Sequence, residues 1–531
     1  MVCLAKLLEN EGALEGRCVF LRTCYDLPLD VSKPRLDPAR VSDDSRVRDS
    51  IATLKFLIAK KARIILEPGW LGRPKGEDPE LSMGCVVKRL EQLLKEAGAL
   101  DFPVLMSPNA LDGSAPRSVY RNKDEVQKAV AQIGNGQVLL LENVRFDPEE
   151  NAADEAFGEF LASLAGKGAL YVNEAEAQNH RPCSSVTVTP IKIAQNGGDA
   201  VLGFHYQKAV NLIGGISKTL SDPSRGKFVF FLTGKKIETQ PGITSKITVA
   251  DSLLEKMKAG DAIVIQGAVC YTFLLAQQFG GLIGPKIVDI EKISSDYNAK
   301  IKQAKDEGKK SGDAKAAEAK MADLENQKSG EILAAIGVNE EKIRTLVGGS
   351  FVDYKQVGQQ VFFAHKLLMR AKSKSVKVIT SQDHIVTDKL PNKSGELPAD
   401  SLIKTFDSAT GIPPYLLGIA PGPKTVQEIS DEIETSKLVL MAGPVSIEDA
   451  KAEAQYGHNR RIFDAIGKAK AAGATTVAAG GDTAAFVNRL GARSSFSIVS
   501  NAGGATLELI EKGTSAGLEA VEKANAIAAS R

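Results

Sequence analysis

Short, nearly continuous apolar runs recur along the chain and constrain its fold more than any other feature. They are too short for helices and do not alternate with polar residues, so they predict strands that are buried on both faces, as in parallel sheets. The first series comprises VFLR (19–22), RIIL (63–66), PVLM (103–106), VLLLENV (138–144) and ALYV (169–172). The second comprises FVFFL (228–232), AIVI (262–265), VKVIT (376–380), KLVLM (437–441), TTVAAG (475–480) and FSIVS (496–500).

Stretches with helical periodicity separate these runs. Residues 46–60 place Ile51, Leu54 and Leu57 near one helix face, and residues 83–97 form a second helical stretch. The alternation of strand and helix predicts an α/β fold with two doubly wound, Rossmann-like parallel sheets. Between the two series, residues 206–220 predict a helix that ends at Ser-Asp-Pro-Ser (221–224), and we expect a hinge between the lobes there.

Composition bounds the class of protein and its partners. The 531 residues exceed one small domain, and 43% hydrophobic and 25% charged residues are typical of a globular protein. With 67 Lys plus Arg against 65 Asp plus Glu, we expect neither nucleic-acid nor membrane binding. The six cysteines lack a C-x-x-C pair, which argues against a zinc site or a disulfide framework. The first residues lack the apolar core of a signal peptide, so we expect a cytoplasmic protein.

Residues 290–330 differ from the rest in being rich in Lys, Ala, Glu and Asp. Ala314, Ala317, Met321 and Leu324 form a weak apolar stripe, which predicts a solvated surface helix inserted into the second lobe. Two interpretations stay open: an extension without chemistry, and a docking helix for a partner protein.

Arginines gather just after the apolar runs of the first series. Ligands of doubly wound sheets sit beyond the carboxyl ends of the strands, so the position shared by these residues matters more than any one of them. Converging guanidinium groups would form a site for phosphate and carboxylate, because the planar fork binds such oxygens in pairs. The residues are Arg22, Arg73, Arg145 and the pair His180-Arg181, with Arg46 opening the first helix.

Glycines occupy the same place in the second lobe. They let backbone amides approach phosphate oxygens, and a following helix N-terminus adds partial positive charge. Neither G-x-x-x-x-G-K-[ST] nor G-x-G-x-x-G after a strand is present, which argues against a P-loop or a dinucleotide site. The glycines are Gly234, Gly267, Gly422, Gly480-Gly481 and Gly503-Gly504.

Six segments resemble the signatures of the phosphoglycerate kinase family and follow that family's order. They are PGWLGRPKGE (68–77), LLENVRFDPEEN (140–151), YVNEAEAQNHRPCSS (171–185), GPKTVQ (422–427), AGGDTAA (479–485) and NAGGATLELIEKG (501–513). The resemblance covers roughly residues 14 to 525. It implies a monomeric glycolytic kinase that transfers a phosphoryl group between 1,3-bisphosphoglycerate with ADP and 3-phosphoglycerate with ATP.

The resemblance also implies a division of labour. An acid-substrate lobe would span 1–203, a hinge helix 204–224 and a nucleotide lobe 225–509, with 510–531 packing back on the first lobe and hinge closure joining the two sites. By matching positions, Arg46, Arg73, Arg145, Arg181, His180 and Asp26 would hold the acid substrate, and Arg46, Lys236, Gly503 and Gly504 would meet the transferring phosphoryl. The nucleotide and its Mg²⁺ would bind at Gly234, Lys246, Gly267, Gly418, Asp449, Gly480, Gly481, Asp482 and Thr483, with Asp482 on the metal.

The chain departs from the family pattern at several of these segments. Cys24 stands for an Asp, Asp26 for an Asn, and Trp70, the only tryptophan, for a His. A bulky ring would either narrow the acid pocket or make a rim contact that leaves the arginines free. The remaining departures are Cys183 and Ile498 for His, Ala442 for Asn, Ala420 for Asp, Ala502 for Gly, and about six extra residues between Lys236 and Lys246.

Three functions therefore stay open from the sequence. The surviving arginines, Lys236 and the Gly480–Thr483 segment favour an active or slow phosphoglycerate kinase. Cys24, Trp70, Ala442 and the widened lysine spacing favour a catalytically weak relative that serves as a binding or structural protein. A third interpretation keeps the nucleotide but replaces the acid substrate with another anion.

Overall fold

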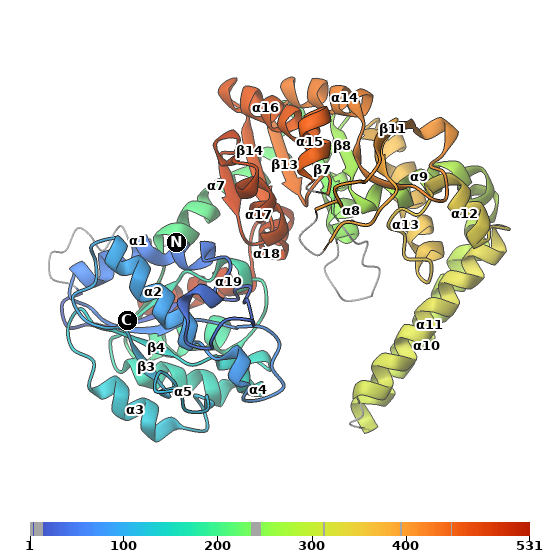
Figure 1. The fold of residues 1–531 in the computed structure, drawn as a ribbon. Coiled ribbons are helices and arrows are strands. Elements are labelled where there is room, and N and C mark those ends of the chain that lie inside the picture. The colour runs from blue at the N-terminus through green and yellow to red at the C-terminus, as the bar shows by residue number, and fades with distance from the viewer. Residues whose placement is uncertain (1–3, 5–13, 235–245, 312–313, 393–395, 448) are drawn as a thin grey trace. The chain divides into compact units, whose positions relative to one another are not determined.

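Two compact units make up the protein. The computed structural model describes residues 4, 14–234, 246–311, 314–392, 396–447 and 449–531 (Figure 1). Unit 1 comprises Met1–Thr219 and Asn501–Arg531, and unit 2 comprises Leu220–Ser500. The chain therefore passes between the units twice, once near the end of helix α7 (Phe204–Ser221) and once after residue 500.

Unit 1 is built on a six-stranded sheet with the strand order β3-β4-β2-β1-β5-β6. Its strands are β1 (Cys18–Arg22), β2 (Arg63–Glu67), β3 (Leu105–Ser107), β4 (Val138–Leu141), β5 (Leu170–Asn173) and β6 (Asp199–Leu202). Every pairing is parallel, and Arg22 at the end of β1 lies opposite Glu67 and Asn173. Because the strands all run in the same direction, the loops that follow them and carry candidate site residues leave the sheet at the carboxyl ends of the strands.

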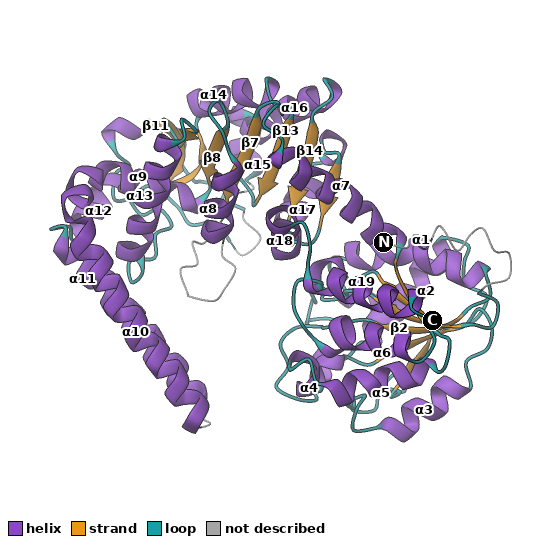
Figure 2. Cartoon of the chain, turned by 180° about the vertical axis from the view of Figure 1, so that it is seen from behind, coloured by secondary structure: helices purple, strands orange, loops and turns teal. Residues whose placement is uncertain are grey.

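Helices lie on both faces of this sheet (Figure 2). The helices of unit 1 are α1 (Ser45–Ala59), α2 (Gly84–Glu96), α3 (Lys123–Ala131), α4 (Pro148–Asn151), α5 (Glu155–Ala165), α6 (Thr189–Gln195), α7, α18 (Gly504–Lys512) and α19 (Ala516–Ala529). The core between α1, α2 and the strands joins Leu54, Leu57 and Leu90 to Ile64 and Leu66. The last helix, α19, packs against α6 and β6, which ties the C-terminal segment to the first lobe.

Unit 2 holds a second six-stranded parallel sheet, with the order β15-β14-β13-β7-β8-β9. Its strands are β7 (Phe228–Thr233), β8 (Ala262–Gln266), β9 (Lys377–Ile379), β13 (Leu438–Ala442), β14 (Thr475–Ala479) and β15 (Ile498–Ser500). A three-stranded antiparallel sheet, β11-β10-β12, lies in the same unit and consists of β10 (Asp383–Thr387), β11 (Ile403–Asp407) and β12 (Leu417–Pro421).

The helices of unit 2 surround its large sheet and extend beyond it. They are α8 (Lys246–Lys256), α9 (Ala268–Ile283), α10 (Ile287–Ser311), α11 (Ala314–Ala335), α12 (Glu340–Val347), α13 (Val357–Ser373), α14 (Pro423–Glu434), α15 (Ala450–Tyr456), α16 (His458–Ala471) and α17 (Gly481–Arg489). Buried Val426, Ile429, Ile462 and Ile466 on α14 and α16 pack with Val439 of β13, so this core has the same layered construction as that of unit 1.

The charged insertion forms a hairpin of two helices, where the sequence predicted one. A helical run from Ala268 to Ser311 leads out of the sheet, and α11 returns alongside α10 (Figure 1). The buried residues Tyr297, Ile301 and Ile332 form its narrow apolar seam. Lys328 is buried and pairs with Glu325 at 2.6 Å, so the hairpin also has a polar contact within its seam.

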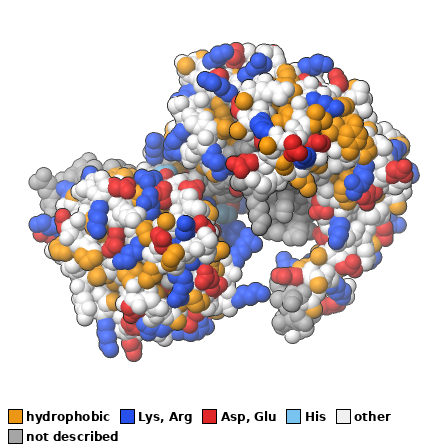
Figure 3. Space-filling view, viewed as in Figure 1, with side chains coloured by type: hydrophobic (Ala, Val, Ile, Leu, Met, Phe, Trp, Pro, Cys, Tyr) orange, Lys and Arg blue, Asp and Glu red, His pale blue; other side chains and the backbone are white. Residues whose placement is uncertain are grey.

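The predicted fold class, two parallel-sheet lobes of α/β type, is confirmed, and each predicted run forms a strand. The sequence missed β6 and the small antiparallel sheet. Mixed positive and negative side chains cover the visible face of both units, as expected from a net charge of +2 (Figure 3). No helix of the described residues is both long and apolar enough to cross a membrane.

Candidate functional site

Two arginines of unit 1 lie over the ring of Trp70, and a third, Arg73, lies near enough to Arg145 to affect its charge. The guanidinium carbon of Arg145 lies 4.7 Å from the centroid of the Trp70 ring, and that of Arg181 lies 5.6 Å from it. Burial lowers the pKa of Arg145, the charges of Arg181 and Arg73 lower it further, and Asp26 opposes them. The three arginines predicted from the ends of the strands therefore lie close enough to interact.

Asp26 and Arg46 border this arginine cluster. The Asp26 carboxylate accepts a hydrogen bond from the Gly72 amide at 2.9 Å, and the Gly72 carbonyl accepts one from Arg145 Nη1 at 2.7 Å. Arg46, at the start of α1, donates one N–H to the Asp26 carbonyl and another to the Asn501 carbonyl at 3.5 Å. Arg46 is thus held between the loop after β1 and the segment that precedes α18.

Trp70 is buried, with 4% of its surface exposed, and lies against the arginines rather than at a rim. Its indole Nε1 donates to Glu150 Oε1 at 3.2 Å. That carboxylate also accepts from the Ser185 hydroxyl at 2.6 Å and the Ser185 amide at 2.9 Å. The hydrogen bond to Glu150 therefore fixes the orientation of the ring through a buried polar network.

Arg22 belongs to this buried network, so its predicted place in the anion crevice is wrong. Its side chain is fully buried, forms an ion pair with Glu67, and donates to Ser185 Oγ at 2.8 Å and Gln178 Oε1 at 2.9 Å. Burial opposes the charge of Arg22, but Glu67 and its neighbours outweigh this and raise its pKa. Its donors are committed within the fold.

The two cysteines that replace family residues are buried neutral groups. Burial raises the pKa of Cys24 although Arg46 and Arg22 lower it, and burial raises the pKa of Cys183 well above its usual range. Cys183 lies 3.8 Å from the Ser185 hydroxyl. Neither thiol supplies the charge or the strong hydrogen bonds of an Asp or His at these positions.

His180 lies beside the N-terminus of α18. Burial and the charge of Arg181 lower its pKa, and its Nε2 accepts a hydrogen bond from Arg181 Nε at 3.3 Å. A Cβ atom on Gly504 would lie 3.5 Å from the same Nε2. The N-terminal amides of α18, at Gly503 and Gly504, are thus in unit 1 close to a neutral imidazole, and a helix N-terminus favours an anion.

In unit 2, the Gly480–Thr483 segment opens helix α17. Gly480 precedes the helix with φ of 111°, which favours glycine, and its amide donates to the Ser500 carbonyl at 3.0 Å. Asp482 is exposed in the first turn, whereas the Thr483 hydroxyl is buried and donates to the Ala479 carbonyl at 2.8 Å. This leaves the first-turn amides and the Asp482 carboxylate as the groups for a ligand.

Gly234 and Gly267 bring three loops together at the carboxyl ends of β7, β8 and β13. Gly267 has φ of 71°, and a Cβ atom there would lie 3.0 Å from the Gly234 amide nitrogen and 3.2 Å from the Pro444 carbonyl. No side chain larger than hydrogen fits this contact without displacing backbone. The packing of the backbone therefore accounts for glycine at position 267, while the contact of these amides with phosphate oxygens stays a prediction.

Two other predicted nucleotide positions are engaged within the fold. The α-carbon of Gly418, in β12, faces Tyr271, whose hydroxyl a Cβ atom would overlap, and its amide donates to Ser350 Oγ at 3.0 Å. Asp449 is 4% exposed, and its carboxylate caps α15 at the Ala452 amide (2.8 Å) and accepts from the Leu397 amide (3.0 Å).

Of the remaining predicted positions, the structure describes all but one. Lys236 lies outside the described residues, and Lys246 is the first residue of α8. Ala442 and Ala420 are buried at or near the ends of β13 and β12, and Ile498 begins β15. Sequence reasoning missed Glu150, Ser185 and Tyr271, because spacing alone does not show which polar side chain of a loop points inward.

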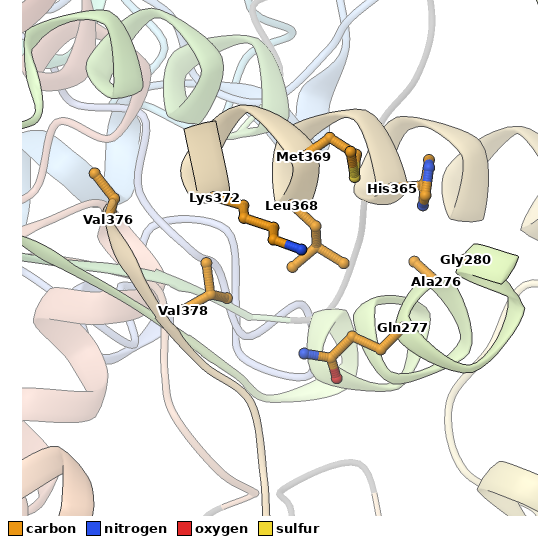
Figure 4. A pocket seen from close by; sticks show the side chains of 9 residues that line it. All are labelled: Ala276, Gln277, Gly280, His365, Leu368, Met369, Lys372, Val376 and Val378. Carbon is orange, nitrogen blue, oxygen red and sulfur yellow. The ribbon is translucent and has the colours of Figure 1, made fainter. Parts of the chain in front are cut away.

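A groove in unit 2 contains none of the predicted site residues. It has a volume of about 500 Å³ and lies between α9, α13 and β9, with His365, Met369 and Lys372 on one side and Gln277 on the other (Figure 4). Among the described residues, no group of three or more His, Cys, Asp or Glu side chains is arranged to hold a metal ion. A Mg²⁺ ion held by Asp482 would share this carboxylate with oxygens of the nucleotide phosphates or of water.

The profile of one protein family, phosphoglycerate kinase, matches residues 10–343 and 344–513. The chain belongs to the phosphoglycerate kinase family. It is 29% identical over 517 residues to the cytosolic phosphoglycerate kinase of Triticum aestivum, with 97% of this chain and 98% of the relative covered. Against the chloroplastic phosphoglycerate kinase 2 of Arabidopsis thaliana the identity is 28%, covering 98% of this chain and 82% of that one.

Solved structures of the family share the fold. The phosphoglycerate kinase of Pyrococcus horikoshii matches with a TM-score of 0.65 at 16% identity and covers 99% of this chain and 100% of its own. That of Coxiella burnetii matches with a TM-score of 0.62 at 19% identity, covering 98% of each. The family's two-lobed architecture therefore extends over the whole chain.

Proposed function

We propose that the protein is a phosphotransferase with a carboxyl group as acceptor, which transfers a phosphoryl group reversibly between 1,3-bisphosphoglycerate with ADP and 3-phosphoglycerate with ATP in glycolysis. The observation that carries the proposal is the cluster of Arg73, Arg145 and Arg181, two of which lie over the Trp70 ring, in a chain that aligns over 97% of its length with a phosphoglycerate kinase. Such a cluster suits a small acid that carries both phosphate and carboxylate.

The residues of unit 1 would bind and orient the acid substrate. We assign Arg73, Arg145, Arg181, His180 and Asp26 to its phosphate and polar groups, and Arg46 to the carboxylate that accepts the phosphoryl group. In the transfer, a carboxylate oxygen forms a bond to the γ-phosphorus while the bond from that phosphorus to the β–γ bridging oxygen breaks. Arg46 and the amides of Gly503 and Gly504 would neutralise the charge on the moving group.

The residues of unit 2 would hold the nucleotide. We assign its phosphates to the first-turn amides of α17 at Gly480–Thr483, to the glycine contact of Gly234 with Gly267, and to Lys236 and Lys246. Gly418 and Asp449 would lie on the nucleoside side. Asp482 would hold Mg²⁺ together with phosphate oxygens, as Mg²⁺ sites built on one carboxylate commonly do, and the ion supplies neutralisation of phosphate charge.

A second candidate function is a family relative that binds anions but turns over weakly. Two observations favour it on the nucleotide side. The Asp449 carboxylate already accepts two backbone hydrogen bonds, and Tyr271 covers the α-carbon of Gly418. A nucleotide would have to displace these contacts to use either position, which would weaken its binding.

A coupled assay that follows ATP-dependent consumption of 3-phosphoglycerate separates the two candidates, with Arg46→Ala as the matched control. Saturable turnover that falls by about a hundredfold or more in the control supports the enzyme. Turnover at the level of the control, together with calorimetric binding of 3-phosphoglycerate or magnesium ADP, supports the binding protein.

We propose that the enzyme acts as a monomer in the cytoplasm, without nucleic-acid or membrane partners. The wheat relative is named as cytosolic, whereas some Arabidopsis relatives are named as chloroplastic. Sedimentation of the full chain tests the oligomeric state, because a monomer of 56.5 kDa and a dimer separate clearly. Fractionation of the source cells tests the compartment.

A further inference from the structure

Three positive side chains lie together in unit 1. Arg73 and Arg181 are both close enough to Arg145 to lower its pKa, so the cluster is under repulsion before any ligand binds. Carboxylates are the usual partners that hold such groups in place, but each carboxylate occupies N–H donors that an anionic ligand would otherwise use. Here Asp26 is the carboxylate that opposes the repulsion, and its Oδ1 already accepts from the Gly72 amide.

Trp70 offers a different kind of partner to these guanidinium groups. Its ring attracts Arg145 and Arg181 through the negative face of the π-system, at 4.7 and 5.6 Å. A guanidinium group that lies with its face on an aromatic ring keeps the N–H donors at its edge available. One edge donor of Arg145 holds the Gly72 carbonyl, and the fork has further donors for a ligand.

The Trp70 ring itself is held in place by buried polar residues. Its Nε1 donates to Glu150, which is fully buried and accepts from the Ser185 hydroxyl and amide. Arg22 lies 3.7 Å from the same carboxylate and also donates to Ser185, so the network continues to the end of β1. A ring held in this way can fix the positions of Arg145 and Arg181.

We propose that Trp70 is a positioning residue of the acid-substrate site: its ring face holds Arg145 and Arg181 together and keeps their donor edges directed at a phosphate- or carboxylate-bearing ligand. The inference rests on the proposed function for the identity of the ligand, but not for the role of the ring. Trp70 stands at a position where the sequence resemblance implies a histidine. Under this proposal, ligand affinity depends on the aromatic face of the indole rather than on an imidazole that titrates.

Steady-state kinetics of Trp70→Leu and Trp70→Phe test the proposal. Loss of the ring in Trp70→Leu should raise KM for 3-phosphoglycerate by about fivefold to thirtyfold and leave KM for ATP within about twofold. Trp70→Phe keeps an aromatic face, so its increase in log KM for 3-phosphoglycerate should be at most half of the increase in Trp70→Leu. Tyr120→Leu is the matched control, because Tyr120 lies under Lys123 in unit 1, 4.3 Å away, outside the site.

Equal effects of Trp70→Leu and Trp70→Phe, an unchanged KM in Trp70→Leu, or the same rise in Tyr120→Leu would each overturn the inference. Far-UV circular dichroism establishes that each variant is folded.

A second measurement needs neither catalysis nor a substituted tryptophan. Titration of the wild-type chain with 3-phosphoglycerate, or with inorganic phosphate, should change the emission of Trp70 in a saturable way, and Arg145→Ala should weaken that response at least about tenfold. If the chain shows no turnover yet gives this response, the proposed function fails and the inference stands. Anion binding by calorimetry with unchanged Trp70 emission would overturn the inference whatever the activity.

Discussion

Replacement of His205 by glutamine should destabilise unit 1 in a way that depends on pH. His205 lies in the first turn of α7, where its Nε2 pairs with Glu176 Oε2 at 2.8 Å and its Nδ1 lies 3.6 Å from Asp49 Oδ1. Burial disfavours the charged imidazole, but the hydrogen bond to Glu176 and the charges of Asp49, Glu176 and Glu174 outweigh it and raise the pKa to about 9. The pKa of a histidine in an unfolded chain is about 6.5.

The sign of the effect follows from this raised pKa. Between about pH 6.5 and pH 9 the folded protein holds a proton on His205 that the unfolded chain releases, so stability falls as the pH rises through this window. The stabilisation is fully present below the unfolded pKa and is lost above the folded one. It amounts to on the order of 2.5 kcal/mol at pH 7 and about 0.2 kcal/mol at pH 9.5. For a unit of this size, 2.5 kcal/mol corresponds to a Tm shift of roughly 5–10 °C.

Trp70 makes the assay specific, because it is the only tryptophan and lies buried in unit 1. Thermal unfolding followed by its emission should show a large difference between wild type and His205→Gln at about pH 7 and almost none at about pH 9.5. The control is His384→Asn, followed by circular dichroism. Burial lowers the pKa of His384 to about 4, so its effect should not change between these two pH values. A difference for His205→Gln that is equal at both values would refute the reasoning.

Three further perturbations test the nucleotide unit. Gly267→Ala should lower its free energy of unfolding by about 1–3 kcal/mol and weaken ADP binding, because φ of 71° and a backbone nitrogen 3.0 Å away exclude a Cβ atom; urea unfolding and calorimetry check this. Asp482→Asn should weaken magnesium ADP binding by at least about tenfold and leave binding of ADP without the metal nearly unchanged in calorimetry. Chelation with EDTA should abolish ATP-dependent turnover without lowering Tm, since the described residues form no metal cluster of their own; a fall in Tm would argue for a structural metal.

The sheets could be predicted because buried parallel strands leave an unambiguous pattern. Each apolar run forms a strand, and the predicted connector at 206–220 lies within α7. The sequence does not predict β6 because Asp199–Leu202 has only three apolar residues, and it does not predict β11 because none of the residues of that strand is buried. The sequence predicts one helix for the insertion because the composition is similar throughout α10 and α11.

The candidate site was predictable only in part. Arg73, Arg145 and Arg181 could be predicted to lie together because each follows a strand, and the carboxyl ends of parallel strands lie side by side. The same rule failed for Arg22, which is the last residue of β1 itself and lies opposite the buried Glu67. Whether Trp70 narrows a pocket, lines a rim or supports its neighbours depends on side-chain direction, and no spacing in the sequence encodes that direction.

We propose that this chain makes an acyl phosphate from 3-phosphoglycerate. Phosphorus-31 NMR of the full chain with Mg²⁺, ATP and 3-phosphoglycerate tests it most directly, because it identifies products rather than counting turnover. We expect ADP and an acyl-phosphate resonance to appear together in equal amounts, and neither to appear with Arg46→Ala. Release of ADP with free phosphate but without the acyl phosphate, or spectra that do not change with time, would contradict the claim.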